Sequence, residues 1–323
     1  MRTTTSSSAP GTSAGDFPVP DLLPSDPVPT SGERALVLGG GGSTGNAWLI
    51  GVVAGLSDAG LDVTTADLTV GTSAGSTAAA QLAGATPAEL YAAALVAPSR
   101  PQAGPISTGQ GRDRTQQAAE QMARTAAVVA GARDASDMRR RLGEAALALP
   151  GSSDEAVQSR WRATVAARLP RRSWPRSTVL LTAVDARTGE PTVFDRQSGV
   201  DLVDAVAASC ASGFAYRVGE RQYLDGGYRR NENADLAAGH RRVLVLSPFG
   251  GRTRAPQEWG LQLSAQVDEL RTRGSEVEVI VPGPAADHLF GPQAMDLSLR
   301  PAAAEAGYER GTALAERVAA LWR

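Results

Sequence analysis

Residues 68–75 read LTVGTSAG, and this stretch decides how the rest of the sequence is interpreted. An apolar run enters a turn in which Gly71 and Gly75 flank Ser73, and the small residues at 76–80 suit the start of a helix. Strand, tight turn and helix in this order are typical of a nucleophile elbow, where only small residues fit beside a strained serine. The turn also places the serine at a helix N-terminus, which favours negative charge. Ser73 is therefore the predicted nucleophile.

The same five letters, GTSAG, occur at 11–15 and provide an internal control. There they lie in a segment rich in Ser, Thr and Pro, with no apolar run before them and no helical pattern after them. Ser13 is not expected to be catalytic, because the surrounding strand and helix define an elbow. Residues 1–32 are predicted to be a disordered N-terminal extension, and residues 33–323 to form the folded domain.

Composition limits the classes of function. The 323 residues are 42% hydrophobic and carry a net charge of −2, so nothing global points to nucleic acid. All 32 basic residues are arginine. The single cysteine, Cys210, excludes an intrachain disulfide, and with two histidines a metal cluster is not expected. The chain shows neither a secretory start nor a long apolar segment, so a cytoplasmic protein without a transmembrane helix is expected.

Apolar runs of strand length alternate with helical patterns along most of the chain. This alternation predicts an α/β fold with a mostly parallel sheet that is covered on both faces. The strands at 177–184 and 191–194 are expected to add an antiparallel pair. The predicted strands are 35–38, 68–70, 177–184, 191–194, 222–224, 242–247 and 276–281, and the predicted helices are 46–60, 86–96, 200–209, 257–273 and 302–322.

A glycine run at 39–45 follows the first predicted strand and precedes the first predicted helix. It is not a P-loop, because no Gly-Lys-Ser/Thr follows. Two interpretations compete. The run matches the dinucleotide fingerprint, G-x-G-x-x-G, but the acidic residue expected about 20 positions later has only Asp62 and Asp67 as candidates. Alternatively, its N–H groups form an oxyanion hole. The oxyanion hole is favoured, because the second strand leads to Ser73 rather than to an acidic residue. The fingerprint would use Gly40, Gly42 and Gly45.

Residues 100–176 show no strand pattern and are rich in arginine, with Trp161 and Trp174 among the basic residues. They are predicted to form a helical insertion or cap. Two interpretations stay open. The segment is either a solvated insertion whose arginines face water, or a cap that rests on an anionic lipid surface, where each basic residue contributes about 1 kcal/mol.

A serine hydroxyl needs a positioned base that takes its proton. His240 precedes a predicted strand, whereas a catalytic histidine follows one, so His288 is the only credible histidine of a triad. The other route uses a carboxylate directly. Asp225 fits this role, because Gly226 and Gly227 let the backbone turn tightly toward the nucleophile loop. Cys210 is expected to be inert core filler.

Taken together, these motifs resemble the signature blocks of patatin-like phospholipases. The resemblance covers residues 34–322 and is weakest in the arginine-rich segment. The matching blocks, in order, are the run 39–45 with Gly51-Val52-Val53, the elbow 71–75, Thr182-Ala183 with Asp185, Thr188-Gly189-Glu190, Phe194, Ala208-Ser209 with Ala211, and Asp225-Gly226-Gly227 with Asn231.

The resemblance implies a three-layer α/β/α fold, a dyad of Ser73 and Asp225, and no metal or cofactor. It assigns the oxyanion hole to the backbone of Gly40, Gly41 and Gly42. The chain departs from the family pattern at two positions. Thr44 stands where the family usually has Arg or Lys, so a positive charge beside the oxyanion hole is missing. Gly213 stands where a proline is common.

The sequence therefore predicts a serine acyl hydrolase, of phospholipase A type or an esterase, that cleaves lipid or other carboxylic esters through an acyl-enzyme. Its partner is the lipid or ester substrate, and peripheral contact with an anionic membrane is a further hypothesis. Two other functions are weighed against it: a dinucleotide-binding protein that uses the glycine run, and a catalytically weak lipid-binding module, which Thr44 suggests.

Overall fold

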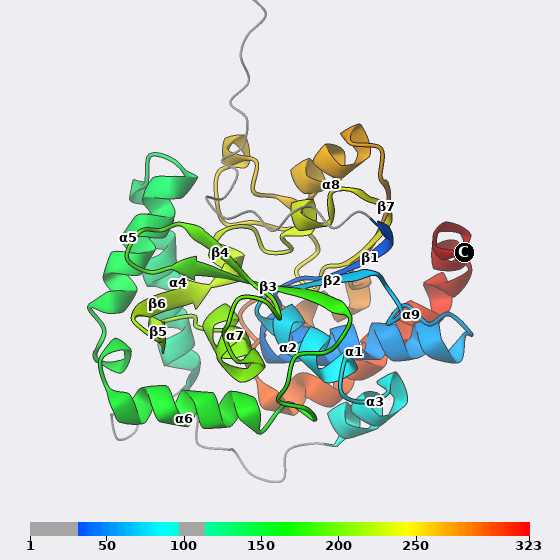
Figure 1. Ribbon diagram of the computed structural model, residues 1–323, viewed down its shortest axis with the longest axis horizontal. Helices are drawn as coiled ribbons and strands as arrows, with labels where there is room; N and C mark the ends of the chain where they lie inside the picture. The colour runs from blue at the N-terminus through cyan, green and yellow to red at the C-terminus, as the bar shows by residue number, and fades with distance from the viewer. Residues whose placement is uncertain (1–31, 97–113) are drawn as a thin grey trace, which may run out of the picture.

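The computed structural model describes residues 32–96 and 114–323 (Figure 1). The predicted disorder of the N-terminal extension falls on residues outside this range, except for Gly32, which begins the first strand. Residues 100–113 of the predicted insertion also lie outside the described residues.

A mixed sheet runs through the middle of the molecule (Figure 1). Its order is β5-β6-β3-β2-β1-β7-β8, with β4 paired to β3. The pairs among β3, β2, β1, β7 and β8 are parallel, whereas β4, β5 and β6 join by antiparallel pairing. The mostly parallel sheet and the antiparallel pair are thus confirmed. The strands are β1 (Gly32–Leu38), β2 (Leu68–Gly71), β3 (Thr178–Asp185), β4 (Pro191–Phe194), β5 (Tyr216–Val218), β6 (Arg221–Asp225), β7 (His240–Leu246) and β8 (Glu276–Ile280).

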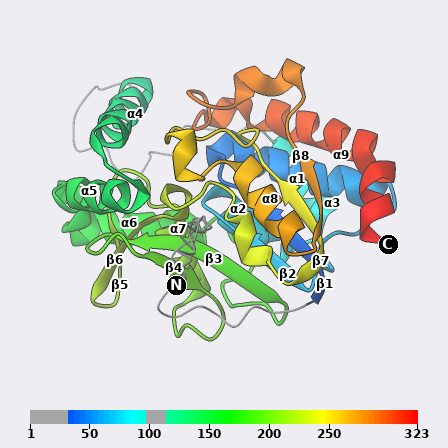
Figure 2. The same cartoon turned by 90° about the horizontal axis from the view of Figure 1, so that it is seen from above.

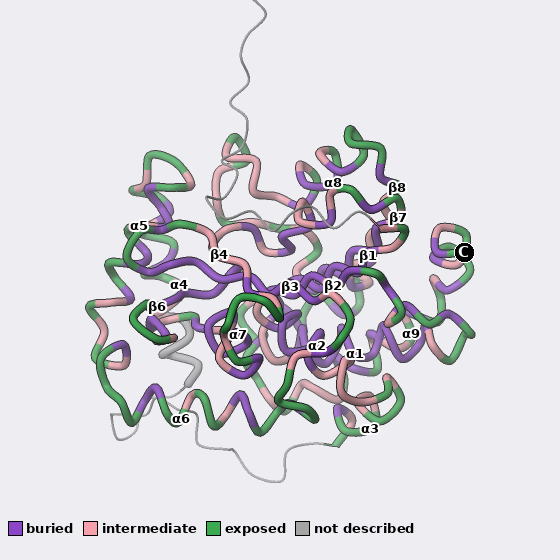
Figure 3. The backbone as a smooth tube through the Cα atoms, in the orientation of Figure 1, coloured by how far each residue is buried: buried purple, intermediate pink, exposed green. Residues whose placement is uncertain are grey.

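Helices cover both faces of this sheet, and α1 and α9 lie side by side in both views (Figures 1 and 2). One face packs on α1, α2, α7 and α9, and the other on α8 and a 3₁₀ turn. The central strands are buried (Figure 3), as expected for a parallel sheet between helices. The helices are α1 (Gly42–Asp58), α2 (Ala74–Leu82), α3 (Pro87–Leu95), α4 (Arg114–Gly131), α5 (Ala135–Leu147), α6 (Glu155–Ala166), α7 (Leu202–Ser209), α8 (Leu263–Thr272) and α9 (Arg300–Trp322).

The predicted helix over 257–273 is wrong in its first half. Gln257–Trp259 form a separate 3₁₀ turn, and α8 begins only at Leu263. The break occurs because Gly260 adopts a left-handed conformation, with φ of 65°, which a helix cannot continue through. In contrast, α1 begins at Gly42, within the glycine run and earlier than predicted.

Glycines on both helices let the backbones of α1 and α9 come into direct contact. A Cβ built on Gly51 would lie 2.1 Å from the carbonyl oxygen of Ala304, and one built on Gly55 would lie 2.2 Å from that of Tyr308. Gly307 meets the backbone of α1 in the same way. Because these contacts leave no room for side chains, they fix the position of α1, and with it the glycine loop, on the last helix.

Replacing Gly51 by Ala is expected to destabilise the fold by about 3 kcal/mol or more, because the helices must separate to admit a methyl group. Denaturant unfolding measures this loss. Gly131→Ala, at the end of α4, is the matched control, since a Cβ there meets only the tip of Arg141 at 3.5 Å. It should change stability by less than about 1 kcal/mol. Equal effects of the two substitutions would contradict the backbone-contact interpretation.

Candidate active site

Ser73 lies between β2 and α2 in a conformation that serine rarely adopts. Its φ of 53° and ψ of −113° fall outside the regions allowed for ordinary residues. Strain of this kind costs about 1–3 kcal/mol and clusters at functional sites. Ser73 is partly exposed, whereas Thr72 and Ala74 beside it are buried. The turn therefore lifts the side chain of Ser73 out of the packed backbone around it.

Two glycines make this turn sterically feasible. A Cβ on Gly75 would lie 1.8 Å from the carbonyl oxygen of Leu38, at the end of β1, and one on Gly71 would lie 2.7 Å from the Cα of Ser76. The elbow therefore presses directly on the strand that leads into the glycine loop. This contact brings residues 71–75 and 39–45 together at the carboxyl ends of neighbouring strands.

Asp225 ends β6 and reaches the same place from the antiparallel side of the sheet. Its Oδ1 accepts a hydrogen bond from the Gly227 N–H at 2.8 Å. The following residue, Gly226, lies so close to β3 that a Cβ would be 2.2 Å from Thr182 Oγ1. Ser73 and Asp225 are thus adjacent, and hydrogen bonding between their side chains acts on the Asp225 carboxylate.

Burial raises the pKa of Asp225 to about 6, against hydrogen bonding from the Ser73 hydroxyl and the Gly227 N–H, which lower it. The carboxylate is only 8% exposed, so the loss of hydration outweighs its two hydrogen-bonding partners. A carboxylate with a pKa in this range exchanges protons near neutral pH, as a general base requires.

Asn233 ties the loops that carry these two residues, and the motifs did not identify it. The residue is fully buried and in a left-handed conformation, with φ of 54°. Its Nδ2 group lies within hydrogen-bonding distance of Thr72 Oγ1 at 3.0 Å and of the Gly226 carbonyl at 3.2 Å. Each of these partners is the immediate neighbour of Ser73 or Asp225. Asn233 therefore sets the spacing between the two loops.

The N–H groups of the glycine loop are not equivalent. The Gly40 N–H donates to the carbonyl of Asn231 at 2.9 Å, so it is already engaged. For Gly41 and Gly42 the structure records no hydrogen-bond acceptor among the described residues. Gly42 has φ of 66°, which turns its backbone in a way that favours glycine. The predicted oxyanion donors are thus narrowed to Gly41 and Gly42, while Gly40 anchors the loop.

Ser209 and Cys210, at the end of α7, contact the backbone of the elbow. Ser209 Oγ accepts from the Ser73 N–H at 3.0 Å. Cys210 Sγ donates to the Ser73 carbonyl at 3.1 Å, and burial raises the pKa of the thiol. The raised pKa disfavours the thiolate, and the contact with Ser73 shows that Cys210 supports the strained turn rather than only filling the core.

Both departures from the family pattern have a structural reason. Thr44 is fully buried, and its Oγ1 donates to the Leu289 carbonyl at 2.9 Å, while its N–H donates to the Ala294 carbonyl at 3.0 Å. A long charged side chain does not fit this enclosed position. Gly213 has φ of 102°, which proline cannot adopt because its ring fixes φ near −65°.

Neither histidine hydrogen-bonds to Ser73 or Asp225 in the part of the chain that the structure describes. His240 is buried at the start of β7, with Nδ1 3.2 Å from the carbonyl of Ala237. His288 is exposed on a 3₁₀ turn, Pro284–Leu289, with Nδ1 3.0 Å from the carbonyl of Ala285. The geometry favours the carboxylate as the partner of the serine.

The acidic candidates for a dinucleotide site lie in the wrong place. Asp67 precedes β2 and accepts from the N–H groups of Glu33 and Arg34, each at 2.9 Å. These residues begin β1, so Asp67 lies at the amino end of that strand. The glycine loop follows the carboxyl end of the same strand. Asp62 accepts from the N–H and hydroxyl of Thr64 in its own turn. A ribose bound at the glycine loop would not reach either carboxylate.

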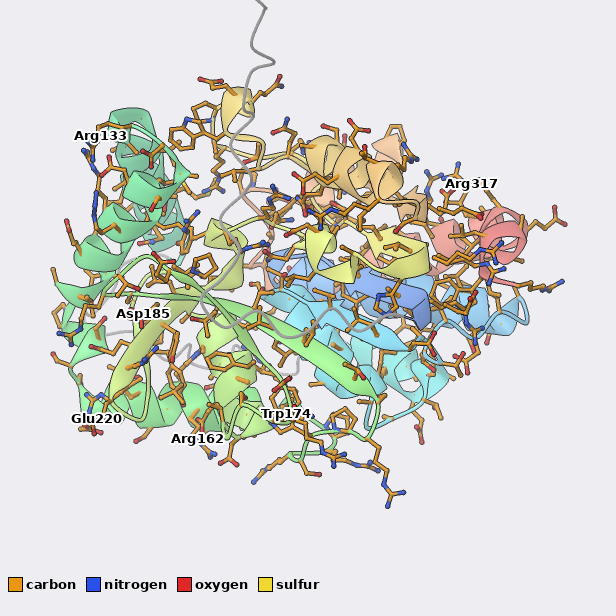
Figure 4. All side chains as sticks on the ribbon, turned by 45° about the horizontal axis from the view of Figure 1, so that its top comes forward. Arg133, Arg162, Trp174, Asp185, Glu220 and Arg317 are labelled. Carbon is orange, nitrogen blue, oxygen red and sulfur yellow. The ribbon has the colours of Figure 1, made fainter. Side chains whose placement is uncertain are left out.

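Helices α4, α5 and α6 form the described part of the arginine-rich segment. The indole N–H of Trp161 donates to the Ala207 carbonyl at 3.0 Å, and that of Trp174 to the Val200 carbonyl at 2.7 Å. Arg162 pairs with Asp204 at 2.8 Å (Figure 4 labels Arg162 and Trp174). Both tryptophans therefore attach this segment to α7 and the loop before it.

Helix α4 lies beside the candidate site. Burial raises the pKa of Tyr228, three residues after Asp225, to about 12, against the influence of Thr125 and Gln121 on this helix, which lowers it. Elsewhere, the described residues contain no cluster of His, Cys, Asp and Glu that could hold a metal ion. No helix in residues 32–96 or 114–323 has the length and apolar character needed to span a membrane.

The strained serine lies between a parallel strand and a helix, and a glycine loop lies beside it at the carboxyl ends of the strands. This arrangement is typical of hydrolases with an α/β fold. The chain belongs to the patatin-like phospholipase family, whose sequence model matches residues 36–238, and it is an ester-hydrolysing enzyme. The three-layer α/β fold and the resemblance inferred from the motifs are thereby confirmed. A comparison with curated proteins found no match.

Among solved structures, the chain is similar to VipD from Legionella pneumophila, with 13% identity and a TM-score of 0.40, covering 88% of this chain and 67% of VipD. It is also similar to ExoU of the type III secretion system of Pseudomonas aeruginosa, in a complex with SpcU. That match has 17% identity and a TM-score of 0.36, and covers 91% of this chain. The chain spans about half the length of ExoU, 53%.

Asp225→Asn is expected to stabilise the fold at pH 7.5 by about 1–3 kcal/mol, since one pKa unit corresponds to about 1.4 kcal/mol. The folded-state pKa lies above the ordinary value of 3.8. The folded protein therefore holds a proton that the unfolded chain releases, and stability falls as pH rises from about 4 to about 6. Asparagine removes that cost.

Denaturant unfolding of the two proteins at pH 7.5 and pH 4 tests this prediction. The advantage of the variant should shrink at pH 4, where the wild-type carboxyl group is protonated in the folded state. An equal difference at both pH values would show that packing, rather than ionisation, is responsible.

Proposed function

We propose that the protein is a serine acyl hydrolase that cleaves lipid or related carboxylic esters with a dyad of Ser73 and Asp225. The observation that carries the proposal is the strained Ser73 backbone beside a buried carboxylate whose pKa is about 6. Membership of the patatin-like phospholipase family supports lipid hydrolysis in general. The dyad and the reaction steps are inferred from the geometry of the site.

In the first half of the reaction, Ser73 Oγ attacks the ester carbonyl carbon as Asp225 accepts the hydroxyl proton. The tetrahedral intermediate places a negative charge on the former carbonyl oxygen. The N–H groups of Gly41 and Gly42 stabilise this charge, and the Ala74 N–H, after the nucleophile, is placed as a further donor. When the intermediate collapses, the C–O bond to the alcohol breaks, and the alcohol leaves with the proton from Asp225.

In the second half, Asp225 takes a proton from water, which attacks the acyl-enzyme. Collapse of the second intermediate releases the carboxylic acid and returns the proton to Ser73. Asp225 thus acts first as base, then as acid, and then repeats both roles. Its raised pKa suits this exchange, because a strongly acidic carboxylate would take up a proton too weakly.

Peripheral contact between the arginine-rich segment and an anionic membrane is part of this proposal. Arginines on α5, on α6 and in the loop before α5 carry the exposed charge, including Arg133, Arg140 and Arg141 around Asp137, and Arg162. Several of these side chains are more than 40% exposed although they are paired. Although Asp137 is buried, the arginine side chains of these pairs are open to solvent, where an anionic lipid surface attracts basic residues.

Ser73→Ala and Asp225→Asn should each lower kcat for a soluble ester by at least about 10³-fold, because each removes one half of the proton-transfer pair. The measurement is ester hydrolysis together with labelling by a fluorophosphonate probe, which should be lost in Ser73→Ala.

His288→Ala is the matched control and should retain wild-type activity, since no contact joins this exposed side chain to the dyad. Full activity of either dyad variant would overturn the mechanism. Absence of probe labelling in folded wild-type protein would favour a non-catalytic lipid-binding module.

The activity should rise with pH through the Asp225 pKa. The carboxylate accepts the Ser73 proton only when ionised, so log(kcat/KM) should climb with unit slope below about pH 6 and level off above it. A plateau that continues down to pH 4 would mean that the base has an ordinary carboxylate pKa. Thermal unfolding at each pH controls for loss of the folded enzyme.

A further inference from the structure

Arg300, the first residue of α9, reaches the N-terminal turn of α1 next to the glycine loop. Its Nη1 donates to the backbone carbonyl of Ser43 at 2.8 Å and to the Ser43 hydroxyl at 3.2 Å. Its Nη2 donates to Asn46 Oδ1 at 3.2 Å. All three acceptors are neutral. They satisfy hydrogen bonds of the guanidinium but leave its positive charge without a counter-ion.

The absence of a counter-ion distinguishes Arg300 from Arg229 and Arg230, two other arginines that are at least partly buried. Arg230 makes a bidentate pair with Glu269, at 2.7 and 2.8 Å, and Arg229 pairs with Asp235. Among the residues that the structure describes, no carboxylate lies within ion-pair distance of Arg300. The positive charges of Arg229 and Arg230 are therefore compensated by carboxylates, whereas that of Arg300, beside the active site, is not.

Arg168, two residues after the end of α6, is an exposed residue whose positive charge acts on Arg300. Its guanidinium carbon lies 5.7 Å from the centroid of the Trp161 ring, and its backbone carbonyl accepts from Gln81 Nε2 at 3.1 Å. Gln81 Oε1 in turn accepts from Asn46 Nδ2 at 2.9 Å. Asn46 and Gln81 thus connect the Arg300 guanidinium to the backbone of Arg168, and the described residues place no acidic partner on the Arg168 side chain.

The two charges repel each other. Burial, together with the charge of Arg168, lowers the pKa of Arg300 to about 10. Arg300 is partly buried whereas Arg168 is exposed, and the repulsion adds to the cost of burying the Arg300 charge unless an anion binds to it. The arrangement therefore favours a negatively charged ligand.

The pair lies close to the nucleophile. Asn46 accepts from Arg300 through Oδ1. Its Nδ2 is 3.5 Å from the carbonyl oxygen of Ala74, the residue after Ser73. On the other side, Arg168 acts electrostatically on the Cys210 thiol, which contacts the Ser73 carbonyl. An ester bound at Ser73 therefore has its remaining groups within reach of this positive region.

We propose that Arg300 and Arg168 form an anion subsite beside the nucleophile elbow and bind the phosphate of a glycerophospholipid substrate. This inference rests on the proposed function, because it assigns a substrate class to that site. A guanidinium presents a planar fork of N–H donors that matches two phosphate oxygens. In this arrangement Arg300 supplies, from the last helix, the positive charge that Thr44 does not.

The test compares two esters with the same acyl chains, dioctanoylphosphatidylglycerol and dioctanoylglycerol, presented in neutral detergent micelles. Arg300→Gln should lower the ratio of kcat/KM for the phospholipid to that for the neutral ester by about 10- to 100-fold, the effect of losing a charged hydrogen bond. Arg300→Lys should recover part of this ratio. Arg172→Gln, which removes an exposed charge four residues after Arg168, should leave the ratio unchanged.

A binding measurement separates this proposal from the catalytic one. In the inactive Ser73→Ala background, calorimetry should show tighter binding of dioctanoylphosphatidylglycerol than of dioctanoylglycerol, and Arg300→Gln should abolish the difference. Inorganic phosphate should compete with the phospholipid and not with the neutral ester. Saturable binding of inorganic phosphate without any preference for the phospholipid would instead identify a free-phosphate site and overturn the headgroup assignment.

The remaining outcomes are equally distinct. If Arg300→Gln lowers activity on both esters equally, Arg300 only supports α1 and the proposal is wrong. If neither ester is hydrolysed by the wild-type protein, the proposed function fails, and the calorimetric comparison still decides whether the anion subsite exists. Equal binding of the two lipids by Ser73→Ala would overturn the subsite even in an active enzyme.

Discussion

The site depends on backbone contact at the carboxyl ends of the central strands. Gly75 lies against the Leu38 carbonyl, where a Cβ would come within 1.8 Å, and Gly226 lies against Thr182, where it would come within 2.2 Å. These contacts join β1 to the elbow after β2, and β3 to the loop after β6. Because no side chain fits at these contacts, the glycine loop, Ser73 and Asp225 lie close together, and the buried Asn233 links the loops of Ser73 and Asp225.

Charge without an ion-pair partner is a feature of this region. Arg230, in contrast, is paired with Glu269. At the site, the Asp225 carboxylate is buried with only hydrogen bonds for compensation, and its pKa rises to about 6. Ser73 adds backbone strain. Both features oppose folding and both serve the proposed chemistry, so the stability of the surrounding sheet and helices must offset them.

The sequence alone was sufficient where backbone geometry restricts the residue type. The sequence predicts Ser73, Asp225 and the glycine run as site residues because tight turns exclude side chains, and most strands followed from their apolar runs. Asn233 was missed since a lone asparagine has no pattern, and its contacts join positions distant in the chain. The role of Gly40 as an anchor, and the helix break at Gly260, depend on hydrogen bonds and a φ value that no local pattern specifies.

The packing of α9 on α1 determines which residue carries the positive charge beside the glycine loop. Thr44 does not carry it, and Arg300 on α9 does. Thr44 uses its hydroxyl to hold the Leu289 carbonyl, so this position is closed to a charged side chain. Arg300 reaches the adjacent Ser43 from α9, and one turn later Ala304 packs against Gly51. The glycine contacts that fasten α9 to α1 therefore also determine where this guanidinium lies. Arg300 lies beyond residues 36–238, which match the family model, so a positive charge beside the glycine loop comes from outside the matched segment.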